Sequence, residues 1–243
     1  MKKLHFIPVL IILLLFNFNT ISQTVDDIIN KYIEAIGGMD NLNAIKTMVL
    51  TGKFGGGGFE APAIITFKRP DKVKFVMDFQ GNSMIQCYDG TTAWQTNPWT
   101  GKPDPEKMPA ERTKDMKEMA DIDGSLVNYK QKGFTAELIG KEDMEGSEVY
   151  KIKLTDKDND VTYYFLDTQT YLLLKESSKR KIKEKEIEAE KFYGNYQKQG
   201  GVMMALSVEF RAKGETTGQT GTIEKVEMNV DVDDAIFKMP EGK

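Results

Sequence analysis

Apolar residues recur at helical spacing near the start of the chain. Ile28, Ile29, Tyr32, Ile33 and Ile36 fall one, three or four positions apart, which is typical of one apolar helix face. Such a stripe needs an apolar partner, and a sheet is the natural one. Residues suited to capping flank the stripe, with Thr24, Asp26 and Asp27 before it and Gly37-Gly38 after it.

Beyond this helix the apolar period changes to two. Val73, Phe75, Met77 and Phe79 fall on one face of an extended chain, and Lys72, Lys74 and Asp78 fall on the other. Met48, Leu50 and Phe54 alternate with Val49, Thr51 and Lys53, and both patterns predict strands with one apolar face. We expect a mainly β fold, an incomplete antiparallel β-barrel of about eleven or twelve strands with helices covering its concave face. The further strands are expected over 61–68, 84–88, 134–139, 149–155, 161–166, 171–177, 186–193, 204–211 and 222–230.

Two segments interrupt the alternation. Between residues 97 and 132, four prolines break the strand pattern and a helix is expected over 110–119, with Met116 and Met119 among its apolar points. This helical insert near 104–130 is interpreted as a lid or plug. The charge-rich segment 179–191 alternates poorly, and we expect a solvated edge strand there, since edge lysines discourage unwanted pairing.

The first 22 residues have the layout of a secretory signal peptide. Lys2 and Lys3 precede an apolar run over 6–16, and small residues follow at Thr20 and Ser22. A helix that crosses hydrocarbon needs roughly 20 apolar residues, so this run is expected to be an export signal that is cleaved near Ser22. The remainder, 23–243, is expected to be a single periplasmic domain.

Charge and cysteine content exclude several classes of partner and modification. The chain carries 37 acidic and 33 basic residues, and loss of Lys2 and Lys3 would deepen the negative balance, which argues against nucleic acid as a partner. Cys87 is the only cysteine. An intramolecular disulfide is therefore excluded, and no cysteine stands at the expected cleavage junction to carry a lipid anchor.

Catalytic chemistry has no support in the sequence, and we expect a protein that is not an enzyme and holds no cofactor or metal. The only histidine, His5, lies in the expected signal peptide, so the usual zinc sites and hydrolases with a histidine base are excluded. Asp156, Asp158 and Asp160 resemble half of a calcium loop, but Val161 stands where that loop needs glycine. We favour a hairpin turn there.

Methionine is abundant, with 13 residues in the chain. Its flexible, polarizable thioether suits a surface that accepts variable apolar cargo. For any single methionine we favour ordinary core filling, and only the set suggests such a surface.

A run of about 30 residues, Lys68-Arg69-Pro70, Tyr88-Asp89-Gly90, Trp94 and Asn97-Pro98-Trp99, resembles the LolA/LolB family of periplasmic lipoprotein carriers. The tail also resembles the carboxy-terminal pattern of LolA-like domains, through Asn229, Asp231, Asp234, Phe237 and Pro240. The family resemblance implies an apolar cavity that holds the acyl chains of lipoproteins in transit to the outer membrane. It further implies an inner-membrane release complex and an outer-membrane acceptor as partners, and a role for Arg69 in latching the helical lid.

The cargo stays open between lipoprotein acyl chains and bulk lipid. A general lipid-binding protein of the cell envelope and a structural β domain without ligand are the alternatives. The residues expected to line the ligand cavity are Met48, Leu50, Val73, Phe75, Met77, Phe79, Met84, Trp94, Met116 and Met119.

Overall fold

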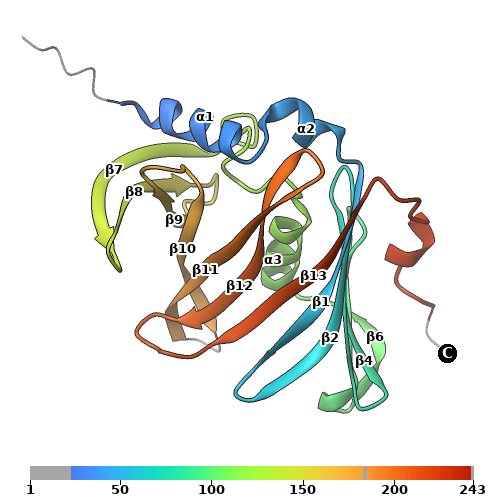
Figure 1. Cartoon of the computed structure of the whole chain (residues 1–243). Coiled ribbons are helices and arrows are strands. Elements are labelled where there is room, and N and C mark those ends of the chain that lie inside the picture. Colours follow the sequence, from blue (N-terminus) through green and yellow to red (C-terminus); the bar gives the residue numbers. More distant parts are fainter. Residues whose placement is uncertain (1–22, 183–184, 242–243) are drawn as a thin grey trace, which may run out of the picture.

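One antiparallel sheet organises the computed structural model of the chain, which describes residues 23–182 and 185–241 (Figure 1). The expected signal peptide, residues 1–22, lies outside the described residues. Thirteen strands of the described part follow the order β6-β5-β4-β3-β2-β1-β13-β12-β11-β10-β9-β8-β7. We call β1–β6 the first wing of the sheet and β7–β13 the second wing. They meet where β1 pairs with β13, with Met48 opposite Met228.

The first wing comprises β1 (Thr47–Gly56), β2 (Phe59–Lys68), β3 (Lys72–Phe79), β4 (Asn82–Tyr88), β5 (Ala93–Asn97) and β6 (Lys102–Lys107). The second wing comprises β7 (Thr135–Met144), β8 (Ser147–Thr155), β9 (Val161–Asp167), β10 (Leu173–Ile182), β11 (Lys185–Gln199), β12 (Val202–Ala212) and β13 (Gln219–Met228). The helices are α1 (Val25–Ala35), α2 (Gly38–Ala44) and α3 (Ala110–Ala120), with 3-10 turns η1 (Pro98–Thr100) and η2 (Asp234–Phe237).

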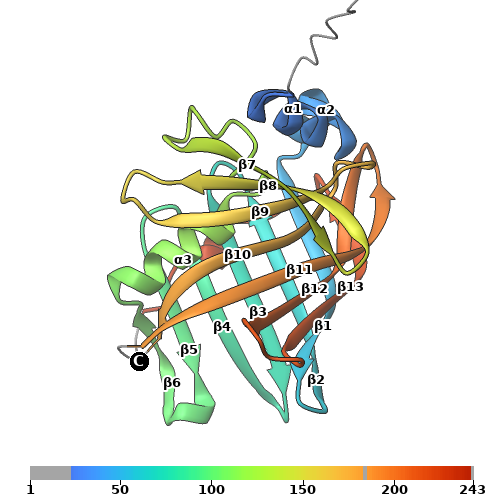
Figure 2. The same cartoon turned by 90° about the vertical axis from the view of Figure 1, so that its left-hand side faces the viewer.

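The sheet curls so that its two wings face each other, but within the described residues it does not close into a barrel, because β6 and β7 each pair on one side only (Figure 2). The mainly β fold is confirmed. The predicted count of eleven or twelve strands is too low, since β5 and β6 were not expected. β5 is only five residues long, and the prolines of β6 lie in an edge strand, where a missing N–H can face away from the ladder.

The helical insert predicted near 104–130 is shorter than expected. Its first residues belong to β6, α3 ends at Ala120, and turns follow it. The predicted edge position of 179–191 holds for the end of the β10–β11 hairpin, where residues 179–182 and 185–188 pair only with each other, but it is wrong for 189–191, which pair with both β10 and β12. Charges at this hairpin meet across the strands instead, as Lys175 does with Glu190 at 3.2 Å and Lys191 with Glu176 at 3.2 Å.

Helix α1 forms as its sequence predicts. Thr24 and Asp27 make a capping box, in which Thr24 Oγ1 accepts from the Asp27 N–H at 3.2 Å and Asp27 Oδ2 accepts from the Thr24 N–H at 3.0 Å. A cap of this kind contributes about 1 kcal/mol. Ile28 and Ile29 are buried against Ile152 and its neighbours in the second wing. The helices α1 and α2 thus lie across one end of the curled sheet (Figures 1 and 2).

The C-terminal segment crosses the outer face of the first wing. Phe237 is fully buried there, and Val232 packs beside it. Lys68 and Lys72 bind Asp234 at 3.0 and 3.1 Å and so hold η2 against the sheet. The outer face of this wing is therefore partly a second core, separate from the inner one.

Candidate functional site

The inner face of the first wing is apolar and aromatic. Register places Leu50 opposite Ile65, Ile65 opposite Phe75, and Met77 opposite Met84, so these side chains share one face. Most of them are buried in two neighbouring clusters. The predicted residues that belong to these two clusters are Met48, Leu50, Val73, Phe75, Met77, Phe79, Met84, Met116 and Met119.

Helix α3 lies inside the curl and contacts β3, β4 and β5 (Figures 1 and 2). Met116 is 3% exposed, and Met119 packs against both inner clusters. The helix therefore occupies space that a ligand on the inner face would need.

Trp94 is not among the residues that the structure brings together there. It pairs with Cys87, and both side chains point to the outer face, where the indole Nε1 donates to the Phe237 carbonyl at 2.8 Å. Its 1% exposure comes from the C-terminal segment that covers it. The geometry is therefore at odds with the predicted role of Trp94 in the ligand cavity. The tryptophan fills a second core, which lies between the outer face of the sheet and the C-terminal segment.

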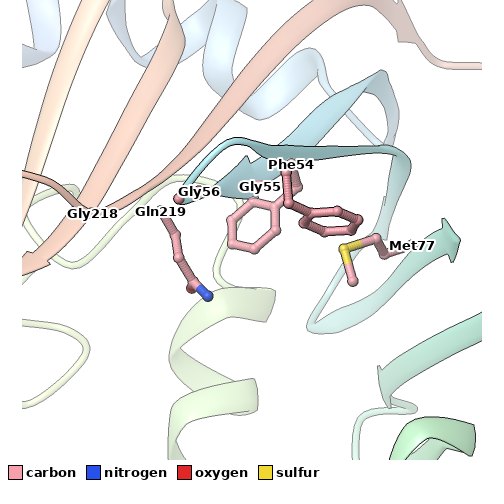
Figure 3. Close-up of a pocket in the computed structure, with 8 residues that line it drawn as sticks. Phe54, Gly55, Gly56, Met77, Gly218 and Gln219 are labelled. Carbon is pink, nitrogen blue, oxygen red and sulfur yellow. The ribbon is translucent and has the colours of Figure 1, made fainter.

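A cavity of about 260 Å³ opens at the end of the inner face, away from α1 and α2 (Figure 3). Met77 lines it with Phe54 and Phe59, beside glycines of the β1–β2 turn. The ring centroids of Phe54 and Phe75 lie 5.7 Å apart in an edge-to-face contact. Phe54 and Phe59 were not in the predicted cavity set, although Phe54 continues the alternation of Met48 and Leu50.

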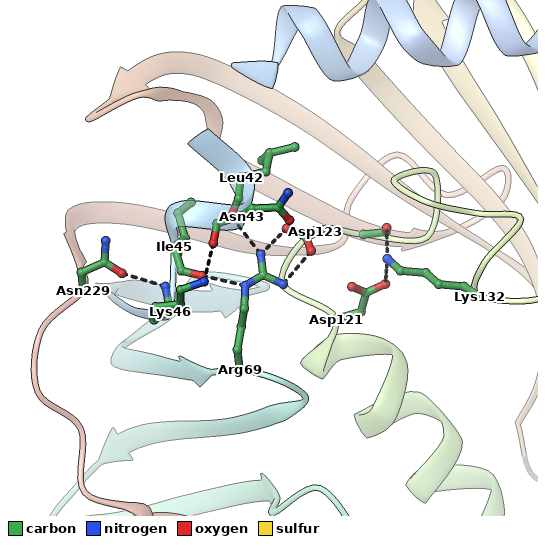
Figure 4. Close-up of polar contacts among 10 residues, drawn as sticks. Leu42, Asn43, Ile45, Lys46, Arg69, Asp121, Asp123, Lys132 and Asn229 are labelled. Carbon is green, nitrogen blue, oxygen red and sulfur yellow. Dashed lines mark hydrogen bonds and ion pairs between the residues drawn. The ribbon is translucent and has the colours of Figure 1, made fainter. Parts of the chain in front are cut away.

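Arg69 joins α2 to the loop after α3 (Figure 4). Its Nε donates to the Ile45 carbonyl at 2.6 Å and one terminal nitrogen to the Leu42 carbonyl at 3.0 Å, both at the end of α2. The guanidinium also binds both carboxylate oxygens of Asp123, at 2.7 and 2.5 Å. This pairing with Asp123 raises the pKa of Arg69. The planar fork of arginine fits carbonyls and a carboxylate at once, which an ammonium cannot do.

A second ionic tie holds α3 from the opposite side. The Lys114 ammonium lies 2.7 Å from Asp156, 3.0 Å from Asp158 and 2.5 Å from Asp160, in the turn between β8 and β9. Burial opposes the charge of Lys114, but the hydrogen bonds to Asp156, Asp160 and Asp158 outweigh it and raise the pKa of the lysine. The carboxylates that resembled a calcium loop thus hold a lysine of α3. Lys114 thus ties the helix itself to the second wing, and Arg69 ties the loop that follows the helix to the first wing.

Cys87 and the possible metal ligands are the remaining reactive groups of the described residues. Burial raises the pKa of the Cys87 thiol to about 12, so the thiol is protonated at neutral pH. Among the same residues, no group of three or more His, Cys, Asp or Glu side chains is placed to hold a metal ion. No helix in the described part of the chain combines the length and apolar character needed to cross a membrane.

Comparison with known proteins supports the fold. No family model matches the sequence, and no curated protein matches it significantly. A LolA superfamily protein from Nitrosomonas europaea is 11% identical with a TM-score of 0.59 over 88% of this chain and 97% of its own. A domain described as an outer membrane lipoprotein-sorting protein, from Vibrio parahaemolyticus, is 10% identical with a TM-score of 0.60 over 87% of this chain and 94% of its own.

A DUF1329 family protein from Desulfovibrio piger has a TM-score of 0.62 at 13% identity, over 89% of this chain and 98% of its own. The fold is therefore that of LolA superfamily structures, and the resemblance that the motifs indicated is confirmed at the level of fold.

Proposed function

We propose that this protein binds acyl chains beneath helix α3 and carries lipoproteins or lipids between membranes of the cell envelope. One observation carries the proposal: α3 packs through methionines on a wall of Met and Phe side chains, while one ion pair ties the helix to the second wing and another ties the loop that follows it to the first wing. A helix that served only to fill a core would not need to be held from both sides by polar groups.

Energetics favour a lid that moves. Pockets for drug-sized ligands occupy roughly 300 to 1,000 Å³, and the cavity of about 260 Å³ is smaller than that range. Each methylene that enters contributes about 0.8 kcal/mol. A long acyl chain therefore gains enough free energy to displace Met116 and Met119 and to break one of the ties. Occupancy is thereby coupled to the position of α3.

The cellular setting is part of the same proposal. The expected signal peptide supports export to the periplasm, and the LolA-like fold supports a lipoprotein as cargo, with an inner-membrane release complex and an outer-membrane acceptor as partners. Bulk lipid fits the inner face equally well. We assign no enzymatic role, because the sequence offers no histidine base outside residues 1–22.

Titration of the purified protein with a fluorescent fatty-acyl probe tests the binding step. We expect saturable binding at one site and displacement by unlabelled lipids. Hydrogen exchange measured with and without saturating ligand should show that the amides of α3 exchange faster when the ligand is bound. Absence of saturable binding, or unchanged exchange in α3 when the site is full, would contradict the proposal.

A further inference from the structure

The second wing presents a different inner face, built from tyrosines around one carboxylate. Register places Tyr164 opposite Glu176, Glu176 opposite Lys191, and Lys191 opposite Phe210. Glu176 accepts from the Tyr193 hydroxyl at 2.8 Å and from the Lys191 ammonium at 3.2 Å. Polar groups of this kind inside a curled sheet are costly unless they have partners or a use.

This polar cluster is connected to the cavity. Phe210 lies opposite Gln219, which lines the cavity, and the Phe210 ring packs against Phe54 with centroids 6.1 Å apart. Lys191 Nζ lies 5.7 Å from the centroid of Phe210. Neighbouring strands are about 4.8 Å apart, so Glu176 stands roughly 15 Å from Gln219 along one row of the sheet. An elongated ligand could reach from one to the other.

Hydrogen-bonding capacity is left over in the cluster. A carboxylate offers about four acceptor positions, and Tyr193 and Lys191 account for two of those on Glu176. Above it, Tyr32 projects from α1, and among the described residues its hydroxyl has no hydrogen-bond partner. Tyr32 packs against the cluster that contains Tyr164, the cross-strand neighbour of Glu176. Burial raises the pKa of Tyr32, and the charge of Glu176 raises it further, so the phenol is a neutral donor.

Charge selects the kind of head group that fits. Glu176 and Lys191 neutralise each other, and their side chains are 20% and 37% exposed. At the acceptor positions that Glu176 has left, an anionic head would be repelled by the carboxylate, and a cationic head would have to share the carboxylate with Lys191. An uncharged head with an O–H or N–H can donate to Glu176 and accept from Tyr32 without either cost.

We propose that Glu176, with Tyr193, Lys191 and Tyr32, holds the polar end of the cargo, and that the cargo is an acyl chain with an uncharged, donor-bearing head. The inference rests on the proposed function and adds the substrate class. The acyl chain lies toward Phe54 and Met77, and the head lies in the second wing. A hydroxyl or amide beside the acyl chain satisfies this requirement, whereas a free fatty acid at neutral pH does not.

Competition against the fluorescent acyl probe at pH 7.4 tests the assignment, with 1-monopalmitoylglycerol and palmitate as competitors of equal chain length. The wild-type protein should prefer the monoacylglycerol by about tenfold, the usual scale of one hydrogen bond to a charged group. Glu176→Gln removes the repulsion, so palmitate should gain and the preference should fall toward one. Lys191→Met leaves Glu176 uncompensated, and the preference should rise severalfold.

Glu190→Gln is the matched control, because Glu190 lies on the outer face of the same hairpin, paired with Lys175, and it should leave the preference unchanged. The opposite signs expected for Glu176→Gln and Lys191→Met keep the test decisive if one variant fails to fold. Equal affinity of the wild type for both competitors, or a preference that both variants retain, overturns the head-group assignment alone. If the probe itself does not bind, the proposed function fails with it.

Discussion

The two wings of the sheet enclose the same interior, but their inner faces carry different side chains. The first wing turns Met, Phe and Val side chains inward, and the second turns inward Tyr164, Tyr193, Glu176 and Lys191 beside its own apolar cluster. A sheet that only had to fold would gain more by lining both wings with apolar residues. The difference indicates that the interior is matched to a molecule with an apolar part and a polar part.

Helix α3 is the element on which both wings act. Its methionines pack on the first wing, while Lys114 reaches the turn of the second wing. The helix therefore stabilises the closed form through two kinds of interaction that respond differently to mutation and to pH. The four predictions below separate them.

The largest effect is expected in the first wing. Phe75→Asp places a charge in a site where the native side chain is 8% exposed, and loss of a buried phenylalanine alone costs about 3 to 5 kcal/mol. Uptake of the acyl probe should be abolished. Val76→Asp, on the outer face of the same strand, is the control and should keep binding. Probe binding by folded Phe75→Asp would mean that this strand does not face the ligand.

The next effect concerns transfer rather than uptake. Arg69→Leu removes the link between α2 and Asp123, and we expect the variant to fold and take up lipid or lipoprotein but transfer it to an acceptor at least tenfold more slowly. Arg69→Lys should rescue transfer only in part, because a point charge cannot replace the fork. Transfer and binding assays on the same samples decide this, and unchanged transfer by Arg69→Leu would remove the latch from the account.

A smaller effect is expected at the tie to the second wing. Lys114→Met leaves three carboxylates without their cation, and we expect a loss of about 1 to 2 kcal/mol in stability together with faster probe uptake, since α3 opens more readily. Stopped-flow mixing and thermal unfolding measure the two changes. The exposed Lys117 of the same helix provides the control, and Lys117→Met should change neither. Slower uptake by Lys114→Met would argue that α3 is not a lid.

The smallest effect is a pH dependence of the same tie. Burial raises the pKa of Asp156, but the hydrogen bond from Lys114 and hydrogen bonds from backbone N–H groups outweigh burial and lower the pKa overall. A carboxyl whose pKa is lowered in the folded state contributes stability above its ordinary pKa of 3.8 and loses that contribution as the pH falls further. The difference in melting temperature between wild type and Lys114→Met should therefore shrink below about pH 4. A constant difference down to pH 2 would contradict an ionic tie.

Much of the fold was predictable from local pattern. The stripe of α1 with its capping box, the helix at 110–119 and the alternation in β3 each arise from interactions within a few residues. β6 was missed because its prolines break the pattern, although they are tolerated at the edge of a sheet. The number of strands was therefore underestimated, because the edge position of β6 depends on the whole sheet and cannot be deduced from its own residues.

The site was predictable only in its first wing. Alternation identified the inner residues of β3, but it could not show that the C-terminal segment covers Trp94 on the outer face. In the second wing, β10 and β11 carry charged residues on both faces, so Glu176 and Lys191 read as solvated side chains. Their role depends on the curl of the sheet and on α1 above them, which are long-range features.

Native mass spectrometry of the protein, purified from the periplasm without detergent, shows whether it carries an acyl chain in the cell. We expect wild-type protein to carry a copurified lipid or acylated molecule, visible as a defined added mass. Folded Phe75→Asp should carry none, while Val76→Asp should carry the same load as wild type. Wild-type protein that is found only at its bare mass, or an equal load on Phe75→Asp, would contradict the proposed function.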